Sequence, residues 1–238
     1  SNNFFYKKNF NKSIKNYKQI VNNKDIKYPI QDLLASNFKK KGNFLKALKI
    51  YKNKLSENKD DYKIYYNIGC LLFELGKNHQ ANYYFIKSKN LNPQSADISW
   101  RQSLCLLKLK DFKNGFLLYE DRWKRENHPN KKFHNIKSAN DISEIKNKKI
   151  LIWDEQGLGD TINFSRFVID ILKFTKKITF VIDKKLKDIL SNLDKEINVV
   201  DYESFKETNY DFQIALGSLP KLLNISTTDD INFYQLTL

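Results

Sequence analysis

The 238-residue sequence has no methionine, only two cysteines and no long apolar run. No stretch approaches the ~20 consecutive apolar residues that a membrane-spanning helix needs. The first residues also lack the basic, apolar and small-residue pattern of a secretory signal. Because methionine is missing even at position 1, we expect the sequence to be a processed chain or a fragment.

Metal and redox chemistry is not predicted. Cys70 and Cys105 fall on predicted core-facing helices without metal-ligand spacing, so we expect small core residues rather than a redox pair. So few cysteines are typical of a reducing cytoplasm, and we expect a cytoplasmic protein without a membrane span. The three histidines form no cluster, and there is no Asp-x-Asp motif, so no metal site is predicted.

Arginine is scarce although the chain is strongly basic. Lysine and arginine together number 42 against 27 acidic residues, which gives a net charge of +15. Arginine is preferred for bidentate contacts to phosphates and bases, so no specific nucleic-acid partner is predicted. The lysines are spread evenly among many Asn and Ile residues, which is typical of a compositional bias of the genome. The positive field would still favour an anionic substrate, including a nucleotide sugar.

A 34-residue period runs through the first half of the chain. Gly42 and Gly76 are 34 residues apart. A small residue followed four positions later by an aromatic one also recurs at this spacing, in Ala47 and Tyr51, Ala81 and Phe85, and Gly115 and Tyr119. This period and pattern indicate tetratricopeptide-type repeats, each a pair of antiparallel helices. We expect about 3.5 units over residues 1–126, with about seven helices between Asn9 and Glu126.

The residue types in these units have physical reasons. Glycine at the turn between two helices adopts a left-handed conformation at little cost. In the best-matching unit, Tyr62–Ser95, Pro93 stops the second helix, because proline cannot continue a helix. In the last unit Lys110 replaces the turn glycine and Gln102 stands where leucine is expected. Terminal repeats are often atypical where they dock on another element.

The second half reads as an α/β domain. Residues 127–147 are polar and are predicted to be a linker, and residues 148–238 alternate apolar runs with helical patterns. This alternation predicts a mostly parallel sheet, whose ligands bind at the carboxyl ends of the strands. The predicted strands are Lys148–Trp153, Ile178–Asp183, Ile197–Tyr202 and Phe212–Leu216, with helices at Thr161–Phe174 and Lys184–Leu193. We expect Tyr119 and Trp123 to pack the last repeat against this domain.

Three stretches resemble a known family. LLYEDRW, then ILIWDEQGLGDTINFSRFVIDI, and later SLP at Ser218–Pro220 resemble a bacterial family of tetratricopeptide-repeat glycosyltransferases. The resemblance covers the chain from about Tyr62 onward. The sugar-transfer part of that family is similar to the two-domain, heptosyltransferase-type GT-B fold. The implied fold class is α plus α/β: a repeat array followed by a Rossmann-like domain, the acceptor-side N-terminal half of a GT-B fold.

The resemblance implies that Asp160 is the catalytic base. An inverting transferase needs a carboxylate to take the proton from the acceptor hydroxyl. A helix N-terminus keeps such a carboxylate ionised. The alternative is that Asp160 caps the helix through the backbone amides of Ile162 or Asn163. By general rules Gly157-Leu158-Gly159-Asp160 is a weak motif, because it is neither a dinucleotide fingerprint nor a P-loop.

Six further residues are candidates for substrate binding: Glu155, Gln156, Gly157, Gly159, Arg166 and Ser218. Glu155 and Gln156 either contact the acceptor or nucleotide sugar or brace the turn. Arg166, about two helical turns along, either pairs with Glu155 or points into the cleft. The two glycines are expected to let the backbone turn tightly and to bring the helix end close to a ligand.

The expected function is sugar transfer from a nucleotide sugar, as co-substrate and without a cofactor, to an acceptor hydroxyl. In GT-B enzymes the second domain binds most of the nucleotide sugar. The sequence ends at Leu238, so we expect the donor half to be missing and the chain alone to be inactive. The repeats would bind a protein or glycan acceptor. The histidine-containing motif of the repeat-bearing O-GlcNAc transferases is absent, so protein O-GlcNAc transfer is not implied. The alternative is a non-catalytic repeat scaffold for protein–protein interaction.

Overall fold

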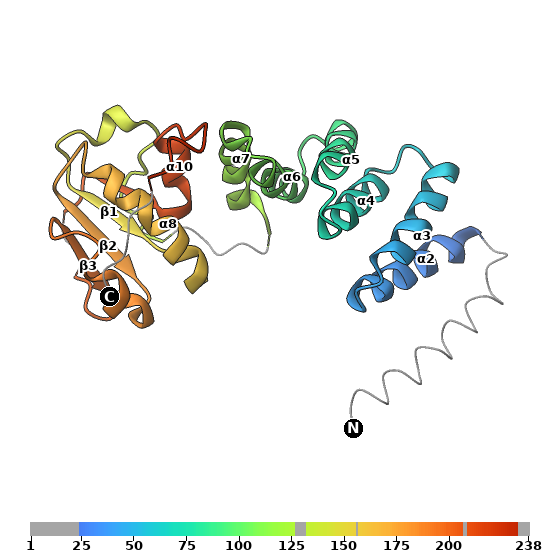
Figure 1. The fold of residues 1–238 in the computed structure, drawn as a ribbon, viewed down its shortest axis with the longest axis horizontal. Helices are drawn as coiled ribbons and strands as arrows, with labels where there is room; N and C mark the ends of the chain where they lie inside the picture. The colour runs from blue at the N-terminus through green and yellow to red at the C-terminus, as the bar shows by residue number, and fades with distance from the viewer. Residues whose placement is uncertain (1–23, 127–131, 156, 207–208, 233–238) are drawn as a thin grey trace, which may run out of the picture. The chain divides into compact units, whose positions relative to one another are not determined.

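The computed structural model describes residues 24–126, 132–155, 157–206 and 209–232. The chain forms two compact units, Ser1–Cys105 and Leu106–Leu238. The described part of the first unit is helical, and the second contains a parallel four-stranded sheet with helices around it (Figure 1). A helical array followed by an α/β part agrees with the predicted fold class. The helix expected near residues 9–23 lies outside the described residues.

Helix pairs build the first unit. The helices are α2 (Lys24–Lys40), α3 (Phe44–Glu57), α4 (Tyr62–Glu74), α5 (Asn78–Leu91) and α6 (Ala96–Lys108), the last of which runs through the boundary between the units. Each helix packs on the next along the chain from α2 to α5, and α4 and α5 have the most extensive contact. The best-matching repeat of the sequence is this α4–α5 pair.

The turns keep the 34-residue period. Gly42 and Gly76 have φ of +73° and +72°, and Lys110, a further 34 residues on, has φ of +63°. Lys110 thus keeps the left-handed backbone conformation that glycine adopts freely. For a residue with a side chain this conformation costs about 1–2 kcal/mol of conformational free energy. The predicted glycine turns are confirmed.

Small and aromatic residues fill the repeat core as predicted. Ala47, Ala81 and Phe85 are fully buried, and Tyr51 is 6% exposed. The Phe85 ring packs so closely on Gly69 of α4 that a Cβ there would lie 2.8 Å from it. Close approach of the backbone therefore explains this mid-helix glycine.

Both cysteines are buried in this array, as expected for core residues. Burial raises the pKa of the Cys70 thiol, and the Cys105 thiol donates to the Asn78 carbonyl at 3.0 Å. Because only the thiolate reacts, we expect neither residue to be alkylated by iodoacetamide in the folded protein and both to be alkylated in urea. Mass spectrometry after timed labelling measures this. Alkylation of either thiol at the rate of a free peptide would contradict the packing.

The second unit alternates strands and helices. Its elements are α7 (Phe112–Tyr119), the 3₁₀ helices η1 (Glu120–Lys124) and η2 (Ile142–Ile145), β1 (Ile150–Trp153), α8 (Leu158–Ile171), β2 (Ile178–Ile182), η3 (Lys184–Leu186), α9 (Lys187–Leu190), β3 (Ile197–Asp201), β4 (Phe212–Ala215), η4 (Leu216–Ser218) and α10 (Leu219–Leu222). Each strand lies within the range that its apolar run predicts.

The sheet is parallel, with strand order β3-β2-β1-β4. Ile150 at the start of β1 pairs with Ile178 of β2 on one side and Phe212 of β4 on the other. β1 and β2 are buried along their whole length. This burial explains why both strands are continuous apolar runs rather than alternating ones.

Each face of the sheet has its own core. On one face Ile150 and Ile152 lie in a cluster with Phe167 and Ile171 of α8. On the other face Leu151 and Trp153 lie in a cluster with residues from the loops around the sheet, including Ile136, Phe133, Phe205 and Tyr210. The sheet therefore has helix on one side and an aromatic-rich layer of loops on the other.

The boundary between the units lies earlier than the sequence predicts. The array was expected to reach residue 126, but the second compact unit begins at Leu106 and includes α7 and η1. Phe116 of α7 meets Phe167 edge-on at 6.5 Å, and Tyr119 stacks on Phe164 at 6.2 Å. Trp123 is half-buried, 5.9 Å from the Trp153 ring. The expected packing of Tyr119 and Trp123 on the α/β domain is found. Because of this packing, α7 and η1 belong to the second unit.

The described part of the predicted linker is also folded. Ile136 and Ile145 are buried, and the Ala139 amide donates to the Gln213 carbonyl at 3.2 Å, so that residues 137–139 run along β4. η2 begins with a capping box between Asp141 and Glu144. The polar composition that suggested a linker reflects exposed residues between these few apolar anchors.

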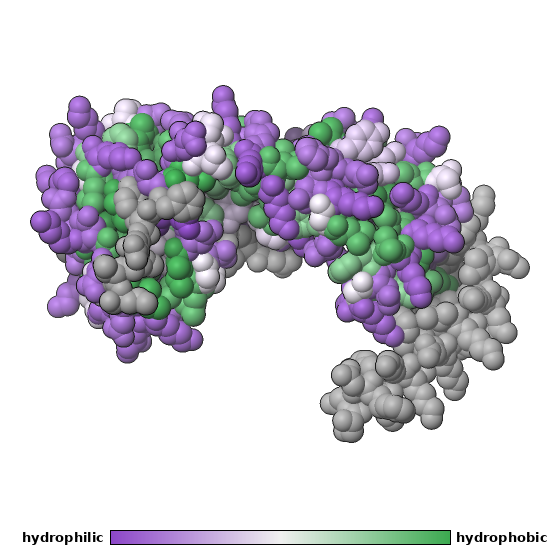
Figure 2. Space-filling model, viewed as in Figure 1, coloured by the Kyte–Doolittle hydropathy of each residue, from purple (hydrophilic) through white to green (hydrophobic). Residues whose placement is uncertain are grey.

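The visible surface is mostly hydrophilic, with smaller hydrophobic patches between (Figure 2). None of the described helices is long and apolar enough to cross a membrane. Leu158 and Ile162, on the first turns of α8, are among the exposed large hydrophobic residues, at 39% and 38%. They stand beside the edge of the sheet where the sequence places its candidate site.

Candidate functional site

The strand order marks one edge of the sheet as the place for a ligand. Along the chain β1, β2 and β3 add in one direction, and β4 then pairs on the opposite side of β1. In open α/β sheets ligands bind outside the carboxyl ends of the strands where the order reverses. Here that point lies between Glu155, which follows β1, and Gly217 and Ser218, which follow β4.

A buried arginine from η1 ties the two strand ends together. The Arg122 side chain is 0% exposed. Its Nε and Nη2 donate to the two carboxylate oxygens of Glu155 at 2.9 and 2.7 Å, a bidentate pair. Nη1 donates to Glu120 Oε1 at 2.6 Å, and Nη2 also donates to Ser218 Oγ at 2.8 Å. The guanidinium lies against the Tyr119 and Trp123 rings, 4.7 and 4.5 Å from their centroids.

The charges of this cluster do not cancel. Burial alone would lower the pKa of Arg122, but the hydrogen bonds and charges of Glu155 and Glu120 outweigh it and raise that pKa. One guanidinium faces two carboxylates, so the cluster is net negative. The buried Glu155 carboxylate depends on Arg122 to offset its desolvation.

Glu155 braces the turn. Besides Arg122, its Oε1 accepts from the Gly217 amide at 2.7 Å, and the side chain is 3% exposed. A Cβ at Gly217 would lie 2.5 Å from that oxygen. Ser218, another predicted substrate residue, donates its hydroxyl to Glu120 at 2.9 Å. Both side chains are therefore committed to internal contacts.

Asp160 differs from these residues in being exposed and unpaired. It is the third residue of α8, whose N-cap is Gly157 without a side-chain cap. Within the described residues its carboxylate takes part in no hydrogen bond or ion pair, so the alternative role as a helix cap is not seen. Asp160 lines a shallow cavity of about 10 Å³ with Tyr119, Glu155, Thr161, Phe164, Leu216 and Gly217.

The geometry leaves Asp160 available to a ligand. The amides at a helix N-terminus stabilise its negative charge. A cavity of about 10 Å³ holds no more than about one water, so a ligand would lie over the carboxylate rather than inside the protein. Leu158 and Ile162 give this surface an apolar border.

Neither glycine at the start of α8 is in a conformation or a contact that only glycine allows. Gly157 has φ of −67°, an extended conformation that any residue adopts. A Cβ on Gly157 or Gly159 would meet nothing within 4 Å. The expectation that these glycines bring the helix end close to a ligand stays a prediction. Their effect is to leave the helix start uncovered.

We expect two glycine substitutions to have opposite effects. Gly69→Ala should lower the free energy of unfolding by about 1–2 kcal/mol, because the new Cβ overlaps the Phe85 ring. Gly159→Ala, the matched control on an open helix surface, should raise it by about 0.5 kcal/mol. Urea unfolding followed by circular dichroism compares them. Equal destabilisation by both would contradict the described environment of Gly159.

The remaining candidates fall elsewhere. Arg166 donates from Nε and Nη2 to the backbone and side-chain oxygens of Asn163 at 2.8 and 2.9 Å. The arginine that pairs with Glu155 is Arg122, not Arg166. Gln156 lies outside the described residues. Within the described ranges no group of His, Cys, Asp and Glu residues is suited to hold a metal ion.

A second polar cluster fixes the ends of β1, β2 and β3. The Tyr202 hydroxyl donates to the buried Asp154 side chain at 2.5 Å, and the Asp183 amide donates to its other oxygen at 2.8 Å. Burial and Asp154 raise the pKa of the Tyr202 phenol. The Lys132 ammonium lies 3.6 Å from Asp154 Oδ1. Asp154 therefore has a structural role beside the free Asp160.

Sequence reasoning missed Arg122. It lies within LLYEDRW, a stretch singled out by resemblance, but nothing there assigned it a partner 33 residues away. A usable signal was composition: arginine occupies four positions in a chain otherwise rich in lysine. An arginine kept under such a bias suggests a bidentate contact that lysine does not reproduce.

The described residues thus define a helical-repeat array and an α/β unit with an open carboxylate at a strand-order reversal. No family model matches the chain, and no curated protein sequence is significantly similar. Among the solved structures that match is the MamA RS-1 ArsTM double mutant, at 26% sequence identity and a TM-score of 0.37. The match covers 39% of this chain and 52% of that one, about half of its length. A TM-score of this size does not establish a common fold.

Proposed function

We propose that this protein is the acceptor-side part of a glycosyltransferase and that Asp160 is its catalytic base. The observation that carries the proposal is the state of Asp160: exposed, unpaired within the described residues, and in the first turn of the helix that follows β1. The neighbouring carboxylates Asp154 and Glu155 are engaged in structural contacts. The sequence resemblance to tetratricopeptide-repeat glycosyltransferases supports the same assignment.

The proposed step is a single displacement. An acceptor hydroxyl lies against Asp160, and its oxygen attacks the anomeric carbon of the donor sugar. The new glycosidic bond forms as the bond from that carbon to the nucleotide phosphate breaks, and the hydroxyl proton passes to the Asp160 carboxylate. The phosphate leaves with the bonding electrons. The apolar border of Leu158 and Ile162 would reduce the water around the reacting hydroxyl.

On this proposal the nucleotide sugar binds chiefly to a second α/β domain, in the same polypeptide or in another. The 238-residue chain should then bind UDP-, GDP- and ADP-sugars weakly or not at all in calorimetric titrations and should transfer no sugar. Micromolar binding of any of these would place the donor site in this α/β unit instead. It would overturn the assignment of this unit to the acceptor side of the enzyme.

A second candidate function is a protein-binding scaffold, which a cavity of about 340 Å³ in the first unit favours. Residues of α2, α3 and α4 line it, and an ion pair of 2.6 Å between the buried Lys54 and the half-exposed Asp32 lies in its wall. A groove between helices suits an extended peptide. Selection of displayed peptides on the immobilised chain tests this function. Binding should be lost in Asn67→Arg, which fills the groove, and kept in Asp160→Asn.

A further inference from the structure

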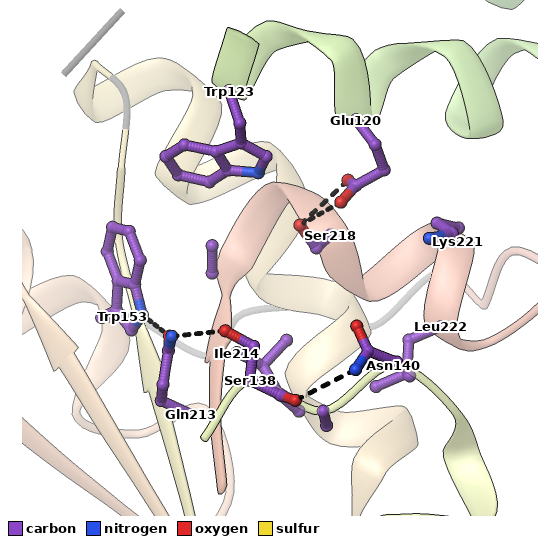
Figure 3. A pocket seen from close by; sticks show the side chains of 12 residues that line it. Glu120, Trp123, Ser138, Asn140, Trp153, Gln213, Ile214, Ser218, Lys221 and Leu222 are labelled. Atoms are coloured by element: carbon purple, nitrogen blue, oxygen red, sulfur yellow. Dashed lines mark hydrogen bonds between the residues drawn. The ribbon is translucent and has the colours of Figure 1, made fainter. Parts of the chain in front are cut away.

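The cavities of the described residues differ greatly in size. Figure 3 shows one at the carboxyl end of β4, where Ser218 bonds to Glu120; its volume of about 50 Å³ holds about three waters. The groove lined by α2, α3 and α4 has a volume of about 340 Å³, which is typical of ligand pockets. This groove can hold part of a peptide, and its polar groups indicate which kind.

The floor of the groove is apolar. Ala35 of α2 and Ile64 and Leu71 of α4 line it, and each is at most 1% exposed. Such a floor gives a peptide a surface to pack on but no polar group that distinguishes one peptide from another. Selection therefore depends on the polar side chains of the walls.

The two acidic groups of the groove are bound by other residues of the chain. Asp32 accepts from the ammonium of the buried Lys54 at 2.6 Å. Burial, followed by the charge and the hydrogen bond of Asp32, raises the pKa of the Tyr51 phenol. Asp61 caps α4 by accepting from the Lys63 backbone amide at 2.8 Å. Both carboxylates thus have structural contacts of their own.

Four polar side chains of the groove have no hydrogen bond or ion pair with another described residue. Lys39 and Lys63 each present an ammonium, Ser36 a hydroxyl and Asn67 an amide. The Lys63 ammonium lies 6.0 Å from the Tyr62 ring, a weak contact at an exposed site. The groove therefore offers two cations that no carboxylate of the described chain pairs with.

These four groups follow one another along the groove. Short turns join α2 to α3 and α3 to α4, and each helix packs on the next, so α2 and α4 run in the same direction. One 34-residue period earlier, Lys63 corresponds to position 29 of α2 and Asn67 to position 33. The order along the helix axes is thus Lys63, Asn67, Ser36 and Lys39. Position 29 lies ten residues before Lys39, which places the two lysines about 15 Å apart along the groove.

We propose that the peptide bound in this groove is extended and carries two acidic side chains four residues apart; the inference rests on the second candidate function, peptide binding by the first unit. Four residues of an extended chain span about 13 Å, and because the offset is even, both side chains lie on the same face. One carboxylate pairs with Lys63 and the other with Lys39. The backbone between them bonds to Ser36 and to Asn67, whose amide both donates and accepts.

The test is a fluorescence-polarisation titration of the whole chain with three labelled seven-residue peptides of alanine and serine, capped at both ends. The first carries glutamate at its second and sixth positions, the second carries glutamine there, and the third carries glutamate at its second and third positions. We expect the glutamine peptide to bind about tenfold more weakly than the first, because it lacks both ion pairs. The third peptide, whose glutamates lie on opposite faces, should bind about threefold more weakly. These differences should shrink in about 1 M sodium chloride.

Matched lysine variants show where the acidic side chains bind. Lys39→Gln combined with Lys63→Gln should weaken binding of the first peptide about tenfold and leave binding of the glutamine peptide unchanged. Lys40→Gln combined with Lys52→Gln removes the same charge at exposed positions that do not line the groove, and it should change neither. Asp160→Asn, in the second unit, should bind the peptides as the wild type does.

The outcomes separate this proposal from peptide binding as such. Equal binding of the glutamate and glutamine peptides, abolished for both by Asn67→Arg, would keep the peptide-binding function and overturn the acidic specificity. Equal losses in the two double lysine variants would show attraction to the net charge of the chain and would also overturn the proposal. So would failure of the first peptide to bind, and the selection of displayed peptides would then show whether the groove binds peptides at all.

Discussion

Replacement of Arg122 by methionine is expected to lower the free energy of unfolding of the α/β unit by about 3–5 kcal/mol. Methionine has a similar volume but leaves Glu155, whose side chain is 3% exposed, without the cation that offsets its desolvation. It also removes the hydrogen bond to Ser218, which holds the end of β4. Urea unfolding followed by tryptophan fluorescence measures the loss, because Trp123 and Trp153 both lie in this unit.

Two further variants test whether the loss comes from the buried charge. Lys124 lies two residues after Arg122 in the same 3₁₀ helix, and Lys124→Met removes its ion pair to Asp121. This substitution should leave the unfolding curve unchanged. Adding Glu155→Gln to Arg122→Met should cost less than the sum of the two single variants, since the unpaired carboxylate is gone. Equal effects of Arg122→Met and Lys124→Met would show that the buried network does not stabilise this edge of the sheet.

Replacement of Asp160 by asparagine is expected to lower turnover by about 10²–10⁴-fold in a two-domain form that transfers sugar. Asparagine has the same shape but cannot take the proton of the acceptor hydroxyl. Folding should be unchanged, because the carboxylate is exposed and has no partner among the described residues. Steady-state kinetics should place the loss in kcat, with the KM for the acceptor little changed.

Asp188→Asn is the matched control for this prediction. Asp188 is an exposed aspartate in the first turn of α9, the helix that follows β2 rather than β1. It should keep the turnover of the wild type. Retention of turnover in Asp160→Asn as well would leave Asp160 without a catalytic role and the base unidentified.

The sequence predicted the elements well because each one depends on local pattern. Period 34 placed Gly42 and Gly76 in left-handed turns, and the same spacing reached Lys110. β1 and β2 were identified because strands that are buried on both faces of a parallel sheet need continuous apolar runs. The predicted position of Asp160 at the start of α8 also followed from one apolar run and the helix after it.

The parts that were missed depend on distant contacts. Arg122 is bound by Glu155 and Ser218, which lie 33 and 96 residues along the chain, and no local pattern reports such a pairing. Its burial draws α7 and η1 into the second unit and moves the boundary away from residue 126. The role of Gly157 and Gly159 stays a prediction, because a Gly-x-Gly motif does not reveal whether the backbone or a ligand requires them.

The most direct test of the proposed function is a sugar-transfer assay on two proteins side by side. One is this 238-residue chain, and the other is a form in which a nucleotide-sugar-binding α/β domain follows residue 238. We predict no transfer by the first, and by the second a transfer that is abolished by Asp160→Asn and kept in Asp188→Asn. Transfer by the 238-residue chain alone, or transfer by the longer form that survives Asp160→Asn, would contradict the account.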